Sequence, residues 1–522
     1  MSKQNTVYII SIFTVFILFV ILKMFSLNPY AGDEHIYIYQ AKLVSEGFLP
    51  YKDFSLAHPP FHTIITAIII KSVGYGFYTT RFFPFLWTII SGTLLTLLTK
   101  NELGKAASVA GLAIFLFSYD LLRVSSHSTG VNCAVALTLA GILFLRKKCS
   151  VPAAIFFSLA LMTRFYVFPV ISAALIYSLF SDRSGTFRTI KFLVFFLFSS
   201  FLFLGLFCGF ENLWTNFFMF HFNKTSMSGE TLSAVTDKFM FHNFTLISLF
   251  ILSIPLYFIK MDKAKSLILL SIICAASMFA LLFSMNRVWS YYFIPALPFA
   301  AIAGGWVVSE WIESIRNKRN IAVTAVTVLI FIVVSVLSFK LESRLDYWDK
   351  EMAKPLENRT HFYKWRDGFL PGFLNTAVNY TLWNEKRVIG NRYFFFNYYL
   401  WHESRVLEIA EEAVEIIIKN TSENGEISGD SGTVPLFALL SGKRIAGNDP
   451  DTNIQKYRSG VFKASDLIFD IDTPKTEMII LRKKFGIAGL SEIKELVARK
   501  YNLINELKDP SGITLLFYKR KN

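Results

Sequence analysis

Long apolar runs are the feature that most restricts how this chain can fold. The segment 192–207 has the sequence FLVFFLFSSFLFLGLF, without a charged residue. Such runs recur from residue 5 to residue 338, whereas residues 339–522 resemble an ordinary globular domain in composition. A hydrocarbon layer about 30 Å thick selects stretches of about 20 apolar residues. Because 53% of the residues are hydrophobic and 17% are charged, we predict a polytopic α-helical membrane protein.

Eleven transmembrane helices are predicted. The first, about 5–27, has no small-residue cleavage site after it, which indicates a retained anchor. The run 60–73 is short, begins with a proline pair and contains Lys71, so we place it on the membrane surface. The other ten spans are expected near 81–99, 106–119, 130–145, 151–163, 165–180, 190–208, 244–259, 266–285, 292–308 and 321–338.

The basic residues predict an orientation. Cytosolic loops of membrane proteins are enriched in Lys and Arg. The connectors on one side hold fifteen of them in 44 positions, and the far longer loops on the other side hold ten. The protein is therefore expected in the plasma membrane, with its amino terminus in the cytosol and its carboxy-terminal domain outside. The connectors assigned to the cytosol are 1–4, 100–105, 146–150, 181–191, 260–265 and 309–320.

Two domains follow from this division. Residues 1–338 form a membrane module whose first outward loop is 28–80, and residues 339–522 form an extracytoplasmic domain. Apolar spacing in this second domain indicates a mixed α/β or α+β structure. We expect helices at 404–420, 434–441 and 491–500, and strands near 466–471, 477–482 and 513–519.

The first outward loop carries the densest polar constellation. A helix over 34–47, ending at Gly47, is expected to lie along the membrane. Adjacent positions on a helix point about 100° apart, so only one of two neighbouring carboxylates can face a given cleft. An acidic residue at a helix start is also a common amino-terminal cap, and the sequence leaves the cap and the catalytic base as alternatives. The polar residues are Asp33, Glu34, Tyr51, Asp53 and His58.

Basic residues on the predicted outer face are candidates for binding an anion. A snorkelling side chain at a helix end is the alternative explanation for each of them. Arg164 differs from the others because it divides an apolar stretch, 151–180, into two short helices and would lie at the outer surface. The candidates are Arg81, Arg164, His221, Lys224 and Arg287.

Several function classes lack their motifs. The chain has no P-loop, no G-x-S-x-G, no H-E-x-x-H and no Rossmann fingerprint. The sequence also lacks the signals of nucleic-acid binding, which are zinc-finger spacing and a basic stripe with interleaved aromatics. Two D-x-D strings, Asp449-Pro450-Asp451 and Asp470-Ile471-Asp472, have no nucleotide-binding βαβ unit around them. A metal-dependent use of a nucleotide sugar is therefore not favoured.

The first loop resembles that of the GT-C glycosyltransferases. It is similar to the first loop of the dolichyl-phosphate-mannose protein mannosyltransferases and of the lipid A aminoarabinose transferases. The layout is similar over 1–310, with specific motifs over 28–82. The matching residues are Asp33-Glu34, Tyr37, Ala41, Gly47, Tyr51-x-Asp53, His58-Pro59-Pro60, Arg81 and, further on, Arg164 and Tyr291-Tyr292-x-x-Pro295-x-x-Pro298.

The resemblance implies transfer of a sugar from a polyprenyl-phosphate donor to a lipid, glycan or protein acceptor outside the membrane, with inversion. Asp33 would accept the proton of the acceptor hydroxyl, and Glu34 would orient the acceptor or the sugar. His58, Arg164, Arg287 and Lys224 are expected to bind the lipid phosphate. Roles in substrate binding or in structure are expected for Tyr51, Asp53, Arg81 and His221.

Departures from the family pattern bear on cofactors and rival functions. Ala57-His58 stands where aminoarabinose transferases have an acidic and a basic residue, so no metal is expected and no cofactor is required. The Trp-Trp-Asp motif of oligosaccharyltransferases is missing. The rivals are a lipid-linked glycan ligase or polymerase and a transporter with an outer binding domain. Transport is disfavoured because charges cluster on the outer face and no internal repeat is evident.

Overall fold

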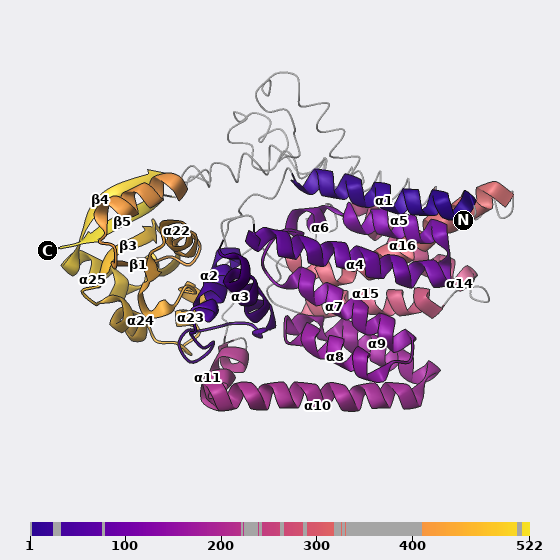
Figure 1. Ribbon diagram of the computed structural model, residues 1–522, viewed down its shortest axis with the longest axis horizontal. Coiled ribbons are helices and arrows are strands. Elements are labelled where there is room, and N and C mark those ends of the chain that lie inside the picture. The colour runs from indigo at the N-terminus through magenta and orange to yellow at the C-terminus, as the bar shows by residue number, and fades with distance from the viewer. Residues whose placement is uncertain are drawn as a thin grey trace, which may run out of the picture.

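The computed structural model describes residues 3–24, 33–75, 79–220, 223, 239, 243–260, 266–284, 290–317, 325, 329, 410–508 and 514–521. A long helical bundle makes up one side of the molecule and an α/β domain the other, with α2 (Asp33–Ser45) and α3 (Phe61–Val73) between them (Figure 1). The polytopic helical fold with a carboxy-terminal α/β domain is confirmed.

Helices occur at every predicted span that falls within the described residues. The span expected at 321–338 lies outside them, apart from residues 325 and 329. The bundle helices are α1 (Lys3–Met24), α4 (Thr79–Leu103), α5 (Lys105–Leu116), α6 (Tyr119–Val124), α7 (Val131–Arg146), α8 (Ser150–Leu161), η1 (Phe165–Val167), α9 (Phe168–Ser181), α10 (Arg183–Cys208), α11 (Phe210–Trp214), η2 (Thr215–Met219), α14 (Phe244–Ile259), α15 (Ser266–Ser284), η4 (Ser290–Ala296) and α16 (Leu297–Asn317).

Only some of these helices are long enough to cross a membrane by themselves. Among the described residues, four apolar segments qualify by length and composition: Gln4–Ile21, Thr79–Leu103, Arg183–Cys208 and Tyr291–Arg316. Seven further apolar helices are shorter, and α3 is one of them. A span of about 20 residues is needed for a hydrocarbon core of about 30 Å, so the number of eleven spans stays a prediction.

Polar contacts at one end of the bundle join the connectors that were predicted to be cytosolic from their Lys and Arg content. Arg146 forms an ion pair with Glu102, at 2.5 Å, and Lys260 forms one with Glu310. Lys105 donates a hydrogen bond of 2.6 Å to Asn5. Since residue 5 and residue 105 lie at the same end, an even number of crossings separates them. The two helices α1 and α4 satisfy this count, and the position of α3 on the membrane surface stays a prediction.

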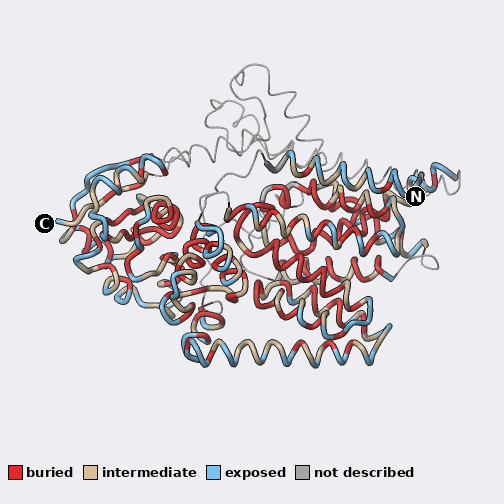
Figure 2. Tube along the Cα trace, in the orientation of Figure 1, coloured by how far each residue is buried: buried red, intermediate tan, exposed pale blue. Residues whose placement is uncertain are grey.

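Small residues set the packing inside the bundle. Helices α5 and α16 approach so closely that a Cβ atom on Gly305 would lie 2.6 Å from the backbone of Ala107 and of Gly111. Such contacts between small residues are typical of membrane helices. Helix α10, by contrast, is largely unburied (Figure 2), with Phe198 and Leu206 among its exposed residues. An exposed row of this kind suits contact with lipid.

The carboxy-terminal domain contains a five-stranded sheet in the order β2-β1-β3-β5-β4. Strand β1 is parallel to β2 and β3, and β5 is antiparallel to β3 and β4. The elements are β1 (Glu426–Gly429), α22 (Val434–Ser441), β2 (Arg444–Ile445), η6 (Ala446–Asn448), α23 (Ile454–Arg458), α24 (Ala464–Ile471), β3 (Thr476–Arg482), η7 (Gly486–Gly489), α25 (Ser491–Lys500), β4 (Tyr501–Lys508) and β5 (Thr514–Arg520).

The predicted strand at 466–471 is wrong, because this segment belongs to helix α24. Leu467 and Ile471 are buried and four residues apart, so they share one face of a helix, whereas Phe469 between them is 83% exposed. The strands expected near 477–482 and 513–519 are confirmed, as are the helices at 434–441 and 491–500. Of the helix expected at 404–420, the described part, 410–420, is helical.

The carboxy-terminal domain and the first loop share one hydrophobic core. Ile38 and Leu43 of α2 belong to the same buried cluster as Phe437 of α22 and Met478 of β3. Figure 1 shows α22 and α23 beside α2. The domain is therefore packed directly on the loop that carries the candidate catalytic residues.

Candidate active site

The structure separates the two adjacent carboxylates of the first loop. Asp33 and Glu34 form the first turn of α2. Asp33 is exposed, whereas Glu34 is buried with 1% of its surface accessible. Neighbouring positions on a helix diverge by about 100°, and here this turns one carboxylate outward and the other into the protein.

Glu34 is held entirely by the protein. Its Oε2 accepts a hydrogen bond of 2.8 Å from Nη2 of Arg81, and its Oε1 accepts one of 2.8 Å from the backbone N–H of Ser128. Arg81 is itself 1% exposed, so it lies inside the structure and does not reach out to a lipid headgroup. Glu34 therefore links the start of α2 to α4 and to the turn before α7.

Arg164 lies between α8 and η1 and is 3% exposed. Its guanidinium stacks over the ring of Tyr37 at 4.7 Å and donates a hydrogen bond to the carbonyl of Thr129. Within the described ranges its Nε has no hydrogen-bond partner, and no carboxylate forms an ion pair with it. A buried cation in this condition strongly favours an incoming anion.

Tyr37 connects Arg164 with Asp33. Burial raises the pKa of the Tyr37 phenol above its ordinary value, and the positive charge of Arg164 opposes that rise. The carboxylates of Asp33 and of Asp451 also act electrostatically on Tyr37. Asp33 acts in the same way on Tyr291. The first loop, the α8–α9 connection and the carboxy-terminal domain thus meet around one tyrosine ring.

A second histidine, His62, belongs to this region although the sequence analysis did not select it. It lies in the first turn of α3 and its Nε2 is 3.1 Å from the carbonyl oxygen of Ser128. Burial and, secondarily, the charge of Arg164 lower its pKa to about 4. Gly130, at φ +79°, allows the close approach, since a Cβ there would lie 3.0 Å from the His62 ring. Its spacing of four residues from His58 was the only sequence signal.

The predicted residues Tyr51, Asp53 and His58 form the turn after α2. Tyr51 has φ +67°, which is strained for a residue with a side chain. Its hydroxyl donates a hydrogen bond of 2.7 Å to the carbonyl of His58, and the His58 ring lies 5.6 Å from the Tyr37 ring. Asp53 accepts a hydrogen bond of 2.7 Å from the N–H of Leu49, so it braces the turn from its exposed side.

Three predicted residues, His221, Lys224 and Arg287, lie outside the described residues. The tyrosine pair of the predicted motif is described. Tyr292 contacts Tyr166, with ring centroids 5.1 Å apart. The structure therefore brings together Asp33, Tyr37, His58 and Arg164 and assigns Glu34 and Arg81 to a buried ion pair beneath them.

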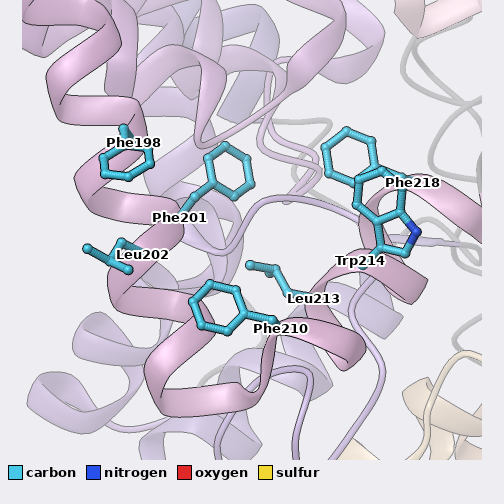
Figure 3. Close-up of a pocket in the computed structure, with 7 residues that line it drawn as sticks. All are labelled: Phe198, Phe201, Leu202, Phe210, Leu213, Trp214 and Phe218. Carbon is cyan, nitrogen blue, oxygen red and sulfur yellow. The ribbon is translucent and has the colours of Figure 1, made fainter.

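An apolar pocket of about 210 Å³ lies beside this cluster. Figure 3 shows seven side chains from α10, α11 and η2 around it: Phe198, Phe201, Leu202, Phe210, Leu213, Trp214 and Phe218. Phe201 stacks on Phe165, at 6.0 Å between ring centroids, and Phe165 follows Arg164 in the chain. One aromatic layer thus separates an apolar pocket from a buried guanidinium.

The carboxy-terminal domain reaches the same region through residues 445–456. The backbone N–H of Ile445 donates a hydrogen bond of 2.8 Å to the hydroxyl of Tyr39. Ser55 donates one of 2.9 Å to Asp449, and Lys456 bonds to both of them. The string Asp449-Pro450-Asp451 is therefore part of the contact with the first loop, which its isolated position in the sequence does not reveal.

The residue types that bind metal ions are spread through the described part of the structure. Among the residues that the structure describes, no three His, Cys, Asp or Glu side chains converge in the manner of metal ligands. Of the second D-x-D string, Asp472 pairs with Lys500 at 2.7 Å and with Arg520 at 3.2 Å. Asp472 is therefore engaged in ion pairs inside the α/β domain.

Comparison with solved structures agrees with this architecture. The fold is similar to that of ArnT, the lipid A aminoarabinose transferase, from Cupriavidus metallidurans bound to undecaprenyl phosphate. The TM-score is 0.62 at 13% identity, over 99% of this chain and 98% of that one. The chain has the GT-C fold. The apo form of ArnT gives a TM-score of 0.60 at 12% identity with the same coverage.

The alignment covers almost all of both proteins, so the similarity includes the α/β domain as well as the helical bundle. No family model matches the sequence, and no curated protein matches it. At 13% identity the similarity establishes the architecture, and the chemistry of the protein must be argued from its own residues.

Proposed function

We propose that the protein transfers a sugar from a polyprenyl-phosphate donor to an acceptor hydroxyl on the outer side of the membrane. The observation that carries the proposal is that an exposed carboxylate, Asp33, acts electrostatically on Tyr37 while a buried guanidinium, Arg164, stacks on the Tyr37 ring. ArnT, which has the same fold, is known with undecaprenyl phosphate bound. Orientation with the amino terminus in the cytosol follows from the basic residues.

Asp33 is proposed as the general base. The acceptor oxygen attacks the anomeric carbon, its proton passes to the Asp33 carboxylate, and the bond between that carbon and the phosphate oxygen breaks. The bonding electrons leave with the phosphate. Because the acceptor attacks in line with the departing phosphate in a single displacement, the configuration inverts and no covalent intermediate forms. A positioned base of this kind contributes about 10²- to 10⁴-fold. The exposed position of Asp33 leaves it accessible to an acceptor.

Arg164 is proposed to bind the phosphate of the donor. Its charge offsets the negative charge that grows on the leaving phosphate, and burial makes this interaction stronger than it would be in water. The His58 ring lies 5.6 Å from the Tyr37 ring, and His58 is proposed as a second phosphate ligand. Arg287 and Lys224 lie outside the described residues, and they are proposed as further phosphate ligands on the basis of the sequence.

The apolar pocket beside Arg164 is proposed to hold part of the prenyl chain. Its lining consists of aromatic and aliphatic side chains, and Phe198, Phe210 and Trp214 are each more than half exposed. Burying such surface against an isoprene chain is favourable at about 25 cal/mol per Å². Glu34 is proposed to position Asp33 through the ion pair with Arg81, since both of its oxygens are engaged.

Release of polyprenyl phosphate from a panel of polyprenyl-phosphate sugars tests the proposal, with purified protein in vesicles that contain membrane extract as acceptor. Asp33→Asn is expected to lower kcat about 10²- to 10⁴-fold with an unchanged melting temperature. Arg164→Met is expected to lower kcat/KM for the donor about 10²- to 10³-fold. Glu211→Gln, an exposed carboxylate of α11, is the control and should behave as wild type.

Three outcomes would count against parts of this proposal. Wild-type turnover by a folded Asp33→Asn protein would remove Asp33 as the base. Activity confined to diphosphate-linked donors would favour the ligase or polymerase alternative. A well-folded wild-type protein that consumes no donor at all would overturn sugar transfer.

A further inference from the structure

A polar cavity of about 230 Å³ lies where the carboxy-terminal domain meets the membrane module. Three separate parts of the chain form it: the turn Tyr51–Ser55, the α11–η2 segment with Asn212 and Asn216, and residues 447–470 of the α/β domain. Pockets for drug-sized ligands begin at about 300 Å³. This cavity is therefore sized for one small unit.

The lining is rich in hydrogen-bonding groups. Four carboxylates and three lysines face the cavity, together with two asparagines and the rings of Tyr457 and Phe462. One lysine, Lys456, is already engaged: it bonds to Asp449 and Ser55 and lies over the Phe462 ring at 4.6 Å. Lys456 and Asp449 thus fix one wall of the cavity, and Asp53 is engaged by the N–H of Leu49.

Asp470 is the clearest of these carboxylates. It is partly buried, and within the described part of the chain it forms neither a hydrogen bond nor an ion pair. Burial and the neighbouring Asp449 raise the pKa of the Asp470 carboxyl. Gly447, at φ +67°, approaches it so closely that a Cβ would lie 2.7 Å from the Asp470 Cβ. A side chain at position 447 would therefore press on this acceptor.

The chemistry of the lining selects among ligand classes. An anion is disfavoured because the carboxylates outnumber the lysines. An apolar chain would leave these polar groups without partners. A ligand with several hydroxyl groups can donate to Asp470, exchange hydrogen bonds with the asparagines and lay an apolar face on the aromatic rings. A sugar ring has all of these properties.

The cavity adjoins the candidate active site through two short connections. Tyr51 lines the cavity, and its hydroxyl bonds to the backbone of His58, whose ring contacts Tyr37. Asp449 also lines it, and Asp451, two residues later, acts electrostatically on Tyr37. From these connections we propose that the cavity binds one saccharide unit of the acceptor, next to the unit whose hydroxyl is activated.

This assignment to the acceptor rests on the proposed sugar transfer, whereas binding of a saccharide can be measured without it. The probes are three neutral glycosides, the methyl glycosides of α-mannose, β-galactose and β-glucose, with inorganic phosphate as the anionic comparison. Binding to the full-length protein in nanodiscs is followed by saturation-transfer NMR. We expect at least one glycoside to bind and phosphate not to compete with it.

Two variants locate the binding. Asp470→Asn and Asn216→Ala, from the two sides of the cavity, should each weaken glycoside binding about tenfold, as loss of one hydrogen bond to a buried site does. Glu495→Gln, an exposed carboxylate on α25, is the matched control and should bind as wild type. Asp33→Asn should also bind as wild type, even where it abolishes transfer.

The proposal is overturned if no glycoside binds to wild type, if phosphate binds in its place, or if folded Asp470→Asn and Asn216→Ala proteins bind as wild type does. Folding is checked by the melting temperature of each variant. Glycoside binding that persists in a protein without transferase activity would support the cavity and contradict the proposed function, so the two can be distinguished.

Discussion

The carboxylate of Glu34 lies 2.8 Å from the guanidinium of Arg81, and each side chain is only 1% exposed. Removing one partner of a buried pair leaves the other charge uncompensated, at a cost of about 3 to 5 kcal/mol. Glu34→Gln and Arg81→Met should each lower the melting temperature strongly. The double variant Glu34→Leu/Arg81→Met should be more stable than either single one, because no charge stays buried.

A matched surface pair provides the control for this prediction. Glu46 and Arg444 are 3.7 Å apart with 34% and 59% of their side chains exposed. Exposed pairs contribute between 0 and about 1 kcal/mol, so Glu46→Gln should melt nearly as wild type does. Equal losses from Glu34→Gln and Glu46→Gln would contradict the distinction drawn between buried and exposed pairs.

His62 gives the protein a specific dependence on pH. Burial and the charge of Arg164 lower its pKa to about 4, and its ordinary value is about 6.5. The unfolded chain therefore binds a proton between these values and the folded protein does not. Stability is full above about pH 6.5 and falls as the pH falls towards 4, by up to about 3 kcal/mol.

Melting temperatures at pH 7.5, 5.5 and 4.5 test this dependence. His62→Gln should show a smaller loss across the range than wild type does, because the substituted side chain does not titrate. The other acidic groups contribute equally to both proteins and cancel in the comparison. Parallel curves for the two proteins would show that His62 does not control this part of the pH profile.

Gly130 and Gly442 have almost the same backbone conformation in different surroundings. Their φ and ψ angles are 79° and −8°, and 73° and 2°. A Cβ on Gly130 would lie 3.0 Å from the His62 ring, whereas a Cβ on Gly442 would meet nothing within 4 Å. Alanine in this region costs about 1 to 2 kcal/mol, so Gly442→Ala should lose that amount and Gly130→Ala more.

The comparison separates backbone strain from crowding. Gly130→Ala is also expected to lower donor turnover, because His62, Ser128 and the Glu34 contact share the displaced turn. Gly442→Ala should leave turnover unchanged. Melting temperature and release of polyprenyl phosphate measure the two effects, and equal values for both variants would exclude the crowding at His62.

Tyr39 joins the first loop to the carboxy-terminal domain. Tyr39→Phe leaves the buried N–H of Ile445 without its acceptor, which costs about 1 to 3 kcal/mol. Hydrogen exchange of residues 442–449 should therefore become faster. Tyr501→Phe is the control. It removes the bond of 3.0 Å that Tyr501 donates to Thr476 and the bond of 3.1 Å that it accepts from Arg520, both within the α/β domain, and should not affect that segment.

Periodicity and motifs predicted much of the fold. The helix expected over 34–47 is observed as α2, Asp33–Ser45, and Gly47 has the positive φ that ends it. Apolar runs located the bundle helices because lipid-facing residues need not alternate with polar ones. Strand β4 was not predicted, since six of its eight residues are exposed and its sequence, YNLINELK, has no alternating pattern.

The sequence could not predict which side chains contact one another in the candidate site. Glu34 and Arg81 are 47 positions apart, and nothing local distinguishes this arginine from one that binds lipid phosphate. The stacking of Arg164 on Tyr37 and the position of Asp451 depend on how three distant segments pack. Such contacts arise from tertiary structure, which propensity and spacing do not encode.

The hydrogen bond between Tyr39 and Ile445 joins residues 406 positions apart. During synthesis the first loop leaves the ribosome long before the segment that completes its core, and contacts of such high sequence separation form late. A chain truncated before residue 445 would insert its helices yet expose the apolar face of α2. The core around the first loop is therefore complete only when translation is nearly finished.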